Sequence, residues 1–178
     1  YAKVLIASLS YLSQKQSDAV GLFALNENKL VSLQPKIQKQ HFSRLLSELI
    51  DIQPEGKWPT STNDSDKLHG RAHKELVFFI TDLYEYDEEL TRFIKRLKTT
   101  KNEVVVLHLL GKNEIDFNYK GSLTFEDLET GTRLKVDAKE ARKTYLQNIK
   151  TTTEKTKDFL YQNNIDYHLF RLDNPINE

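Results

Sequence analysis

Hydrophobic positions recur along the chain with two spacings, one typical of helices and the other of short strands. Helical spacing marks residues 1–16, 35–50, 87–97 and 138–163. Apolar runs of strand length lie between them, at residues 19–25, 30–33, 76–80, 103–110 and 165–172. Two further alternating segments, residues 123–128 and 132–136, flank a Glu-Thr-Gly turn signature. We therefore expect helices and strands to alternate, with hairpins at residues 19–33 and 123–136.

Two of the helices have a recognisable buried side. The second helix is expected to open at Pro35, because proline suits the first turn of a helix. Its buried stripe would comprise Phe42, Leu45, Leu46, Leu49 and Ile50. The inner side of the long helix would comprise Ala141, Tyr145, Ile149, Thr152, Phe159 and Leu160. Residues 53–65 are rich in turn-forming residues, which predicts a loop, and a short helix is expected at residues 66–73.

The strands at residues 76–80 and 103–110 are apolar without interruption, which is typical of strands covered on both faces of a parallel sheet. Strands that alternate with helices predict an α/β fold, a doubly wound and mostly parallel sheet with helices on both faces and an inserted β-hairpin. The length of 178 residues suits a single domain, residues 1–178. Because Met is absent and Tyr1 enters a helical pattern directly, we expect this domain to come from a longer protein.

Composition narrows the possible functions. The chain has 26 Lys and Arg and 26 Asp and Glu, so it lacks the overall positive charge expected of a protein that binds nucleic acid or a membrane surface. Its longest apolar runs are far shorter than the roughly 20 residues of a membrane-spanning helix. There is no Cys, which excludes a disulfide framework and a Cys-based metal or redox site. We expect a cytoplasmic location.

Three segments resemble a known bacterial family. They are the opening YAKVLIASLSYL, the strand end FFITDL, and FEDLETG at residues 125–131, which a long helix follows. These segments are similar to the domain of unknown function fifty-eight, whose members carry a von Willebrand factor A-like domain of Rossmann type. The resemblance runs from Tyr1 through Asn174 and implies that fold. Gly131 has a structural role in it, since glycine readily adopts the conformation of a tight turn.

The resemblance also implies a metal-ion-dependent adhesion site, where three loops supply oxygen ligands to Mg²⁺. Mapped by motif, the third loop is Thr81-Asp82, at the carboxyl end of a strand, where ligands bind in open α/β sheets. The first loop, Asp-x-Ser-x-Ser, occurs nowhere in the chain and would lie on a strand before Tyr1. The second falls at residues 56–58, where Trp58 replaces a threonine and offers only an N–H donor. We therefore expect a degenerate metal site.

Several alternatives remain open at these positions. Asp82 is either a metal ligand or a cap for the helix that follows, and a slipped second loop would bring Thr60 or Thr62 to the metal. His69 and His73 have the spacing of a helical zinc pair, or they are polar residues near a helix end. His108 lies within an apolar run and is expected in the core or at the strand end.

The sequence favours a binding function over an enzymatic one. It contains no Gly-x-Ser-x-Gly elbow, no phosphate-binding loop and no dinucleotide fingerprint. We predict a non-enzymatic protein-interaction module without a cofactor. The partner-binding residues would be Thr81, Asp82, Tyr84, Tyr86 and Trp58. The family resemblance implies a partner, a MoxR-type AAA+ ATPase that acts in assembly or maturation of other proteins. The alternatives are a Mg²⁺-dependent binding domain or hydrolase, if an upstream loop completes the metal site, and a purely structural domain.

Overall fold

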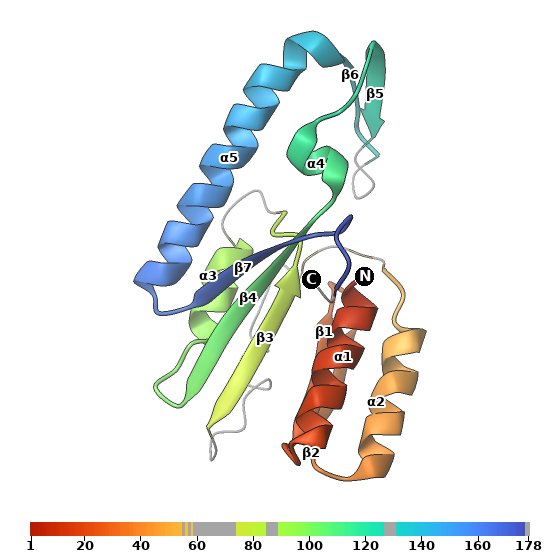
Figure 1. Ribbon diagram of the computed structural model, residues 1–178, viewed down its shortest axis with the longest axis vertical. Helices are drawn as coiled ribbons and strands as arrows, with labels where there is room; N and C mark the ends of the chain where they lie inside the picture. The colour runs from red at the N-terminus through yellow and green to blue at the C-terminus, as the bar shows by residue number, and fades with distance from the viewer. Residues whose placement is uncertain (55, 57, 59–73, 85–88, 127–130, 177–178) are drawn as a thin grey trace. The chain divides into compact units, whose positions relative to one another are not determined.

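The computed structural model describes residues 1–54, 56, 58, 74–84, 89–126 and 131–176 (Figure 1). The chain divides into two units, Tyr1–His69 and Gly70–Glu178. The first contains α1 (Ala2–Lys15), β1 (Val20–Leu25), β2 (Leu30–Lys36) and α2 (Lys39–Asp51). The second contains β3 (Glu75–Thr81), α3 (Glu89–Leu97), β4 (Asn102–Leu110), α4 (Lys112–Asp116), β5 (Ser122–Glu126), β6 (Arg133–Asp137), α5 (Ala138–Gln162) and β7 (Asp166–Arg171). Helices and strands alternate, which confirms the α/β class. The short helix predicted at residues 66–73 lies outside the described residues.

The hairpin predicted in the first unit is confirmed. β1 and β2 pair antiparallel over most of their length. The Asn26 side chain closes the turn, because its Oδ1 accepts the backbone N–H of Asn28 at 2.9 Å and of Lys29 at 2.7 Å. The core of this unit comprises Leu22, Leu33, Leu45 and Leu49. It therefore joins one face of the hairpin to one stripe of α2.

Two predictions about the second helix are wrong. Pro35 lies in β2 and not at the start of α2, opposite an irregularity in the strand pairing between Val20 and Leu22. A proline can occupy a strand at such a bulge because no ladder hydrogen bond needs its missing N–H there. Ile50 is 69% exposed, whereas His41 is buried and its Nε2 lies 2.9 Å from the Val20 carbonyl oxygen. The buried stripe of α2 therefore comprises His41, Leu45 and Leu49 and leaves out Ile50.

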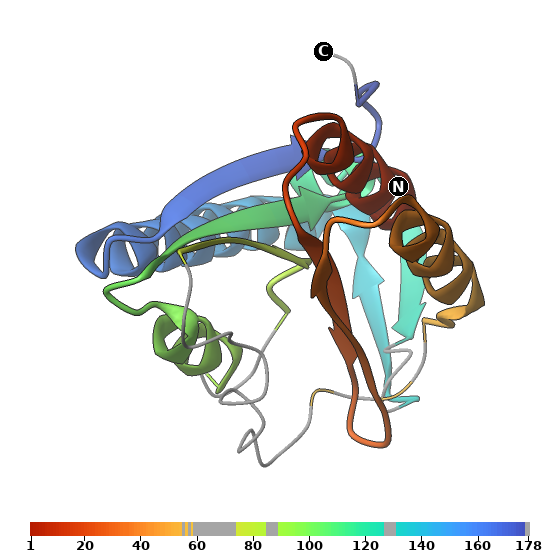
Figure 2. The same ribbon diagram turned by 90° about the horizontal axis from the view of Figure 1, so that it is seen from below.

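The second unit is built on a parallel sheet in the order β3-β4-β7. Figure 2 shows these strands side by side, with α3 beneath them. Val104 and Val106 in β4 are 1% and 0% exposed. The Phe79 ring of β3 lies 6.0 Å from that of Phe93 in α3, centroid to centroid. The apolar runs of the sequence therefore form the inside of an α/β layer, as predicted.

β3 is an edge strand of this sheet in the described part of the chain. Leu76 is 55% exposed and Phe78 is 39% exposed. They lie on one face of the strand, since alternate residues of a strand point to the same side. The prediction that residues 76–80 are covered on both faces is therefore wrong for these two side chains.

The predicted inserted hairpin is confirmed between β4 and β7, where β5 and β6 pair antiparallel. Gly131, near its turn, has φ of 70°, the left-handed conformation that suits glycine. Asp137 caps α5, because its carboxylate accepts two backbone N–H groups of the first turn at 2.9 and 3.1 Å. On the predicted inner side of α5, Leu160 is fully buried, but Thr152 is exposed.

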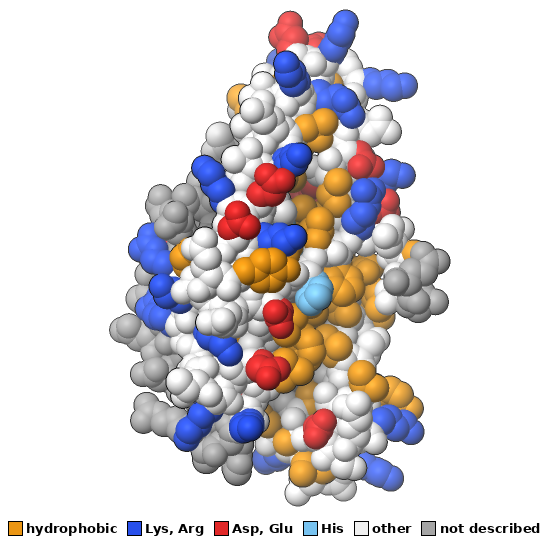
Figure 3. Space-filling model, turned by 60° about the vertical axis from the view of Figure 1, so that its left-hand side comes forward, with side chains coloured by type: hydrophobic (Ala, Val, Ile, Leu, Met, Phe, Trp, Pro, Cys, Tyr) orange, Lys and Arg blue, Asp and Glu red, His pale blue; other side chains and the backbone are white. Residues whose placement is uncertain are grey.

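Charged residues are frequent along α5. Figure 3 brings this helix toward the viewer and shows Lys, Arg, Asp and Glu side chains spread over this side of the molecule. No helix among the described residues, α5 included, is long and apolar enough to cross a membrane.

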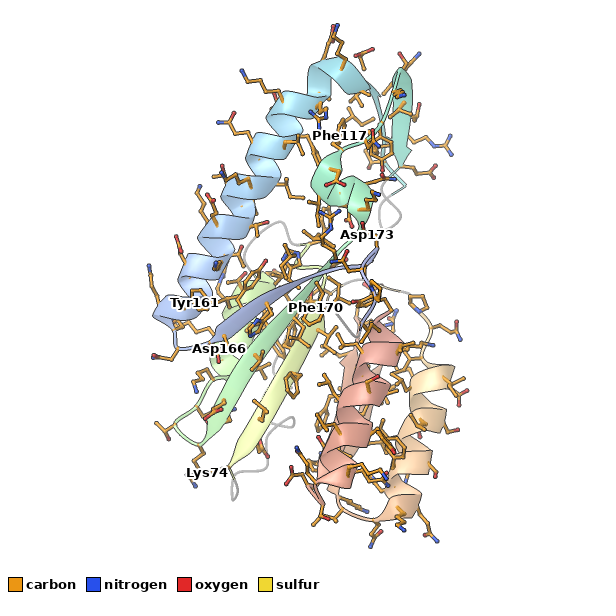
Figure 4. All side chains as sticks on the ribbon, in the orientation of Figure 1. Lys74, Phe117, Tyr161, Asp166, Phe170 and Asp173 are labelled. Carbon is orange, nitrogen blue, oxygen red and sulfur yellow. The ribbon has the colours of Figure 1, made fainter. Side chains whose placement is uncertain are left out.

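Aromatic rings connect the inserted hairpin to the helices around it. The Phe117 ring, marked in Figure 4, lies 4.6 Å from the Tyr145 ring of α5 and 6.1 Å from the Phe125 ring of β5, centroid to centroid. At the end of β7, the Arg171 guanidinium donates to the Asp116 carboxylate of α4 at 3.2 Å. These contacts tie α4 and the hairpin to the parallel sheet.

Candidate functional site

The loop that follows β3, residues 81–84, is shaped by side-chain oxygens of its own residues. Thr81 Oγ1 accepts the backbone N–H of Leu83 at 3.0 Å, and Asp82 Oδ1 accepts the backbone N–H of Tyr84 at 3.2 Å. Leu83 has φ of 53°, in the left-handed region that residues with a Cβ rarely adopt. Such a conformation costs on the order of 1 kcal/mol. The side-chain hydrogen bonds offset this cost.

A third hydrogen bond reaches the 81–84 loop from the neighbouring strand. His108 of β4 stands opposite Thr81 in the parallel ladder, and this is the last pair of that ladder. Its Nε2 lies 2.9 Å from the backbone oxygen of Asp82, one residue further on. Its Nδ1 lies 2.7 Å from the hydroxyl of Tyr167 in β7. A chain of hydrogen bonds therefore runs from β7 through β4 to the 81–84 loop.

Burial sets the protonation of this His–Tyr pair. Desolvation lowers the pKa of His108 below its ordinary 6.5, although the bond to the Asp82 carbonyl and the Asp82 charge oppose the shift. The Asp82 carbonyl oxygen can only accept a hydrogen bond, so the neutral His108 ring carries its proton on Nε2. The unprotonated Nδ1 then accepts a hydrogen bond from the Tyr167 hydroxyl. Burial raises the pKa of Tyr167 to about 12, so that hydroxyl remains a donor at neutral pH.

The structure brings together three of the predicted partner-binding residues. Thr81 ends β3, and Asp82 and Tyr84 follow it in the same loop. Tyr84 is 59% exposed and Asp82 is also exposed. Tyr86 lies outside the described residues, and Trp58 belongs to the first unit, so their part in the surface stays a prediction.

Asp82 acts as a local cap. Its carboxylate binds the N–H of Tyr84, within the loop, while the described part of α3 begins at Glu89. The alternative, that Asp82 caps the next helix, involves residues 85–88, which lie outside the described residues. What the structure gives is a carboxylate that shapes its own loop.

The described residues supply an incomplete set of ligands for a cation at this loop. Among them there is no group of three His, Cys, Asp or Glu side chains that could hold a metal ion. Thr81 Oγ1 and Asp82 Oδ1 each accept a backbone N–H. His69 and His73 lie outside the described residues. Mg²⁺ binding at Asp82 therefore stays a prediction.

The sequence pattern placed His108 correctly in the core at the strand end but gave no role to Tyr167. His108 is 5% exposed and Tyr167 is 6% exposed. The available signal was a single imidazole inside the apolar run of residues 103–110, because a buried polar group needs hydrogen-bond partners. Its partners lie 26 and 59 positions away along the chain and depend on the strand order.

The family model for "Protein of unknown function DUF58" matches residues 1–155. The chain belongs to this family. The match spans the 81–84 loop, the inserted hairpin and most of α5 of this DUF58 protein, and it confirms the resemblance drawn from its motifs. No curated protein matches the chain.

Two solved structures share the fold of this DUF58 protein. A conserved hypothetical protein BatB from Bacteroides thetaiotaomicron is 12% identical with a TM-score of 0.56, and the match covers 98% of this chain and 79% of that one. An aerotolerance-related membrane protein from Bacteroides fragilis NCTC 9343, solved with multiple mutations to serines, is 18% identical with a TM-score of 0.57. That match covers 97% of this chain and 80% of the other. At such identities the similarity establishes the fold alone.

Proposed function

We propose that this DUF58 protein is a non-enzymatic protein-interaction module whose contact surface is the 81–84 loop. The observation that carries the proposal is a loop of defined conformation with an exposed aromatic side chain. Local hydrogen bonds fix the backbone around Leu83, while Tyr84 is 59% exposed. A loop that is ordered before binding loses little conformational entropy on binding, and tyrosine is a frequent anchor of protein interfaces.

The metal site of the fold is degenerate in this proposal. The Thr81 hydroxyl and the Asp82 carboxylate stabilise the loop itself, a task that the protein can perform without a cation. Trp58, at the position expected for a threonine ligand, has no oxygen to offer. Calorimetric titration of the full-length protein with Mg²⁺ and Mn²⁺ should therefore show no specific binding. Saturable binding that Asp82→Ala abolishes would instead support the Mg²⁺-dependent alternative.

The partner in this proposal is a MoxR-type AAA+ ATPase, and the two proteins would act in the cytoplasm on assembly or maturation of other proteins. Membership of the DUF58 family supports this partner, because the family resemblance implies it. One structural neighbour is described as an aerotolerance-related membrane protein, which makes tolerance of oxygen a reasonable phenotype to examine in a deletion strain.

A binding measurement with matched variants tests the surface. Tyr84→Ala should weaken capture of the MoxR-type ATPase by about 30-fold, because a central aromatic anchor is worth about 2 kcal/mol or more. Asp82→Ala should also weaken it by releasing the loop. Tyr161→Ala is the control, since Tyr161 is 47% exposed on α5, away from the loop in sequence. Equal affinities for the Tyr84 and Tyr161 variants would overturn the proposed surface.

A further inference from the structure

The hydrogen bond from His108 to Asp82 is unusual in its position. The paired residues of β3 and β4 end at Thr81 and His108, so the Asp82 carbonyl lies one residue beyond the ladder. The His108 side chain supplies a donor to that carbonyl at 2.9 Å. The imidazole therefore extends the contact between the two strands into the 81–84 loop, at the point where backbone pairing stops.

The ring itself is fixed from the opposite side. Tyr167 holds Nδ1 at 2.7 Å, and the two rings meet edge to face with centroids 5.8 Å apart. Both His108 and Tyr167 are buried, so water does not compete for these hydrogen bonds. A ring held at Nδ1 presents Nε2 in one direction, toward the Asp82 carbonyl.

The hydrogen bonds made by the Thr81 and Asp82 side chains are local. Thr81 and Asp82 each bind an N–H two residues ahead, so these contacts stay within the turn and do not join it to another strand. The bond from His108 comes from another strand, and it places the turn relative to the sheet. Leu83, in its left-handed conformation, follows directly after the residue that His108 holds.

We infer that His108, oriented by Tyr167, is a positioning residue that fixes the 81–84 loop for partner binding. The part of this inference that concerns binding rests on the proposed function, whereas the part that concerns the loop does not. His108 would touch no partner atom. Its effect would pass through the Asp82 carbonyl to the direction in which the Asp82 and Tyr84 side chains leave the sheet.

Two substitutions separate the contacts of the imidazole. In His108→Gln the amide nitrogen stands near the place of Nε2 and can still donate to the Asp82 carbonyl. In His108→Asn the shorter side chain stands near Nδ1, within reach of Tyr167 but not of Asp82. Both variants lose one buried hydrogen bond, so a merely structural role predicts similar behaviour for them. Circular dichroism verifies that each variant is folded.

The readout is amide hydrogen exchange at Leu83, measured by NMR on the full-length protein. Exchange should be at least tenfold faster in His108→Asn than in the wild type, and His108→Gln should stay within about threefold of the wild type. Capture of the ATPase should follow the same order. Equal exchange in the two variants would overturn the positioning role. Faster exchange with unchanged capture would support the positioning role and overturn the proposed function.

A measurement on the unsubstituted protein gives a second test, which stands even if both variants fail to fold. Nitrogen-15 NMR of the histidine rings distinguishes the two neutral tautomers. The inference requires the proton of His108 on Nε2 and an unprotonated Nδ1. A proton on Nδ1 would leave the Asp82 carbonyl without its donor and would overturn the positioning role of His108.

Discussion

Substitution of Tyr167 by phenylalanine removes one hydroxyl from the buried His108–Tyr167 pair and keeps the ring. The His108 Nδ1 loses its donor at 2.7 Å and stays buried in a site that is 5% exposed. A buried acceptor left without a partner costs about 1–3 kcal/mol. The His108 ring cannot avoid the loss by shifting its proton to Nδ1, because Nε2 would then no longer donate to the Asp82 carbonyl.

We therefore expect Tyr167→Phe to lower the free energy of unfolding by about 2 kcal/mol. For a chain of this size, such a loss lowers the melting temperature by roughly 4–8 °C. Urea unfolding monitored by circular dichroism measures the change as a lower midpoint with an unchanged slope.

Tyr161→Phe provides the matched control, since it removes the same atom from a neighbouring tyrosine. Tyr161 is 47% exposed, and its hydroxyl donates to the Tyr167 carbonyl at 3.3 Å, where water can replace it. The expected loss is about 0.5 kcal/mol or less. A Tyr167→Phe variant as stable as this control would refute the assigned hydrogen-bond chain.

Three further predictions concern stability. Leu160→Ala should lower the free energy of unfolding, measured in urea, by about 2–5 kcal/mol, because Leu160 is 0% exposed. Leu134 is 62% exposed, so the control Leu134→Ala should change the free energy of unfolding by less than about 0.5 kcal/mol. Asp137→Ala should lower the melting temperature through a loss of about 1 kcal/mol, and Asp137→Asn should lose less because its amide oxygen still accepts at the helix start. Because burial lowers the pKa of His108 in the folded protein, the unfolded chain takes up a proton on this ring at a higher pH than the folded protein does. The stability contributed by the neutral, buried His108 ring is therefore complete above pH 6.5 and is lost as the pH falls toward the folded pKa. Urea midpoints at about pH 7.5 and pH 5 should therefore differ more in the wild type than in His108→Gln.

The alternation of helices and strands could be predicted because the hydrophobic period differs between the two. The Gly131 turn and the helix after Asp137 carry local signals that depend on a few neighbouring residues. Pro35 misled the prediction because proline suits both a helix start and a strand bulge, and only the pairing with β1 decides between them.

The site could be predicted only in part. Asp82 was singled out through the family resemblance, which maps the third metal-binding loop onto Thr81-Asp82 at the end of an apolar strand. The exposure of Leu76 and Phe78 depends on where helices pack, and the partners of His108 depend on strand order and register. Neither is encoded in the local spacing of residues, so both required the folded structure.

Hydrogen exchange across the whole protein, with and without the ATPase, tests the proposed contact surface most directly. Mass spectrometry of the full-length protein would follow peptides from the 81–84 loop and from β6 as an internal reference. If the 81–84 loop is the contact surface, exchange at Leu83 and Tyr84 should slow when the ATPase is bound, and exchange in β6 should stay unchanged. Slower exchange elsewhere, with no change in the 81–84 loop, would contradict the proposed contact surface.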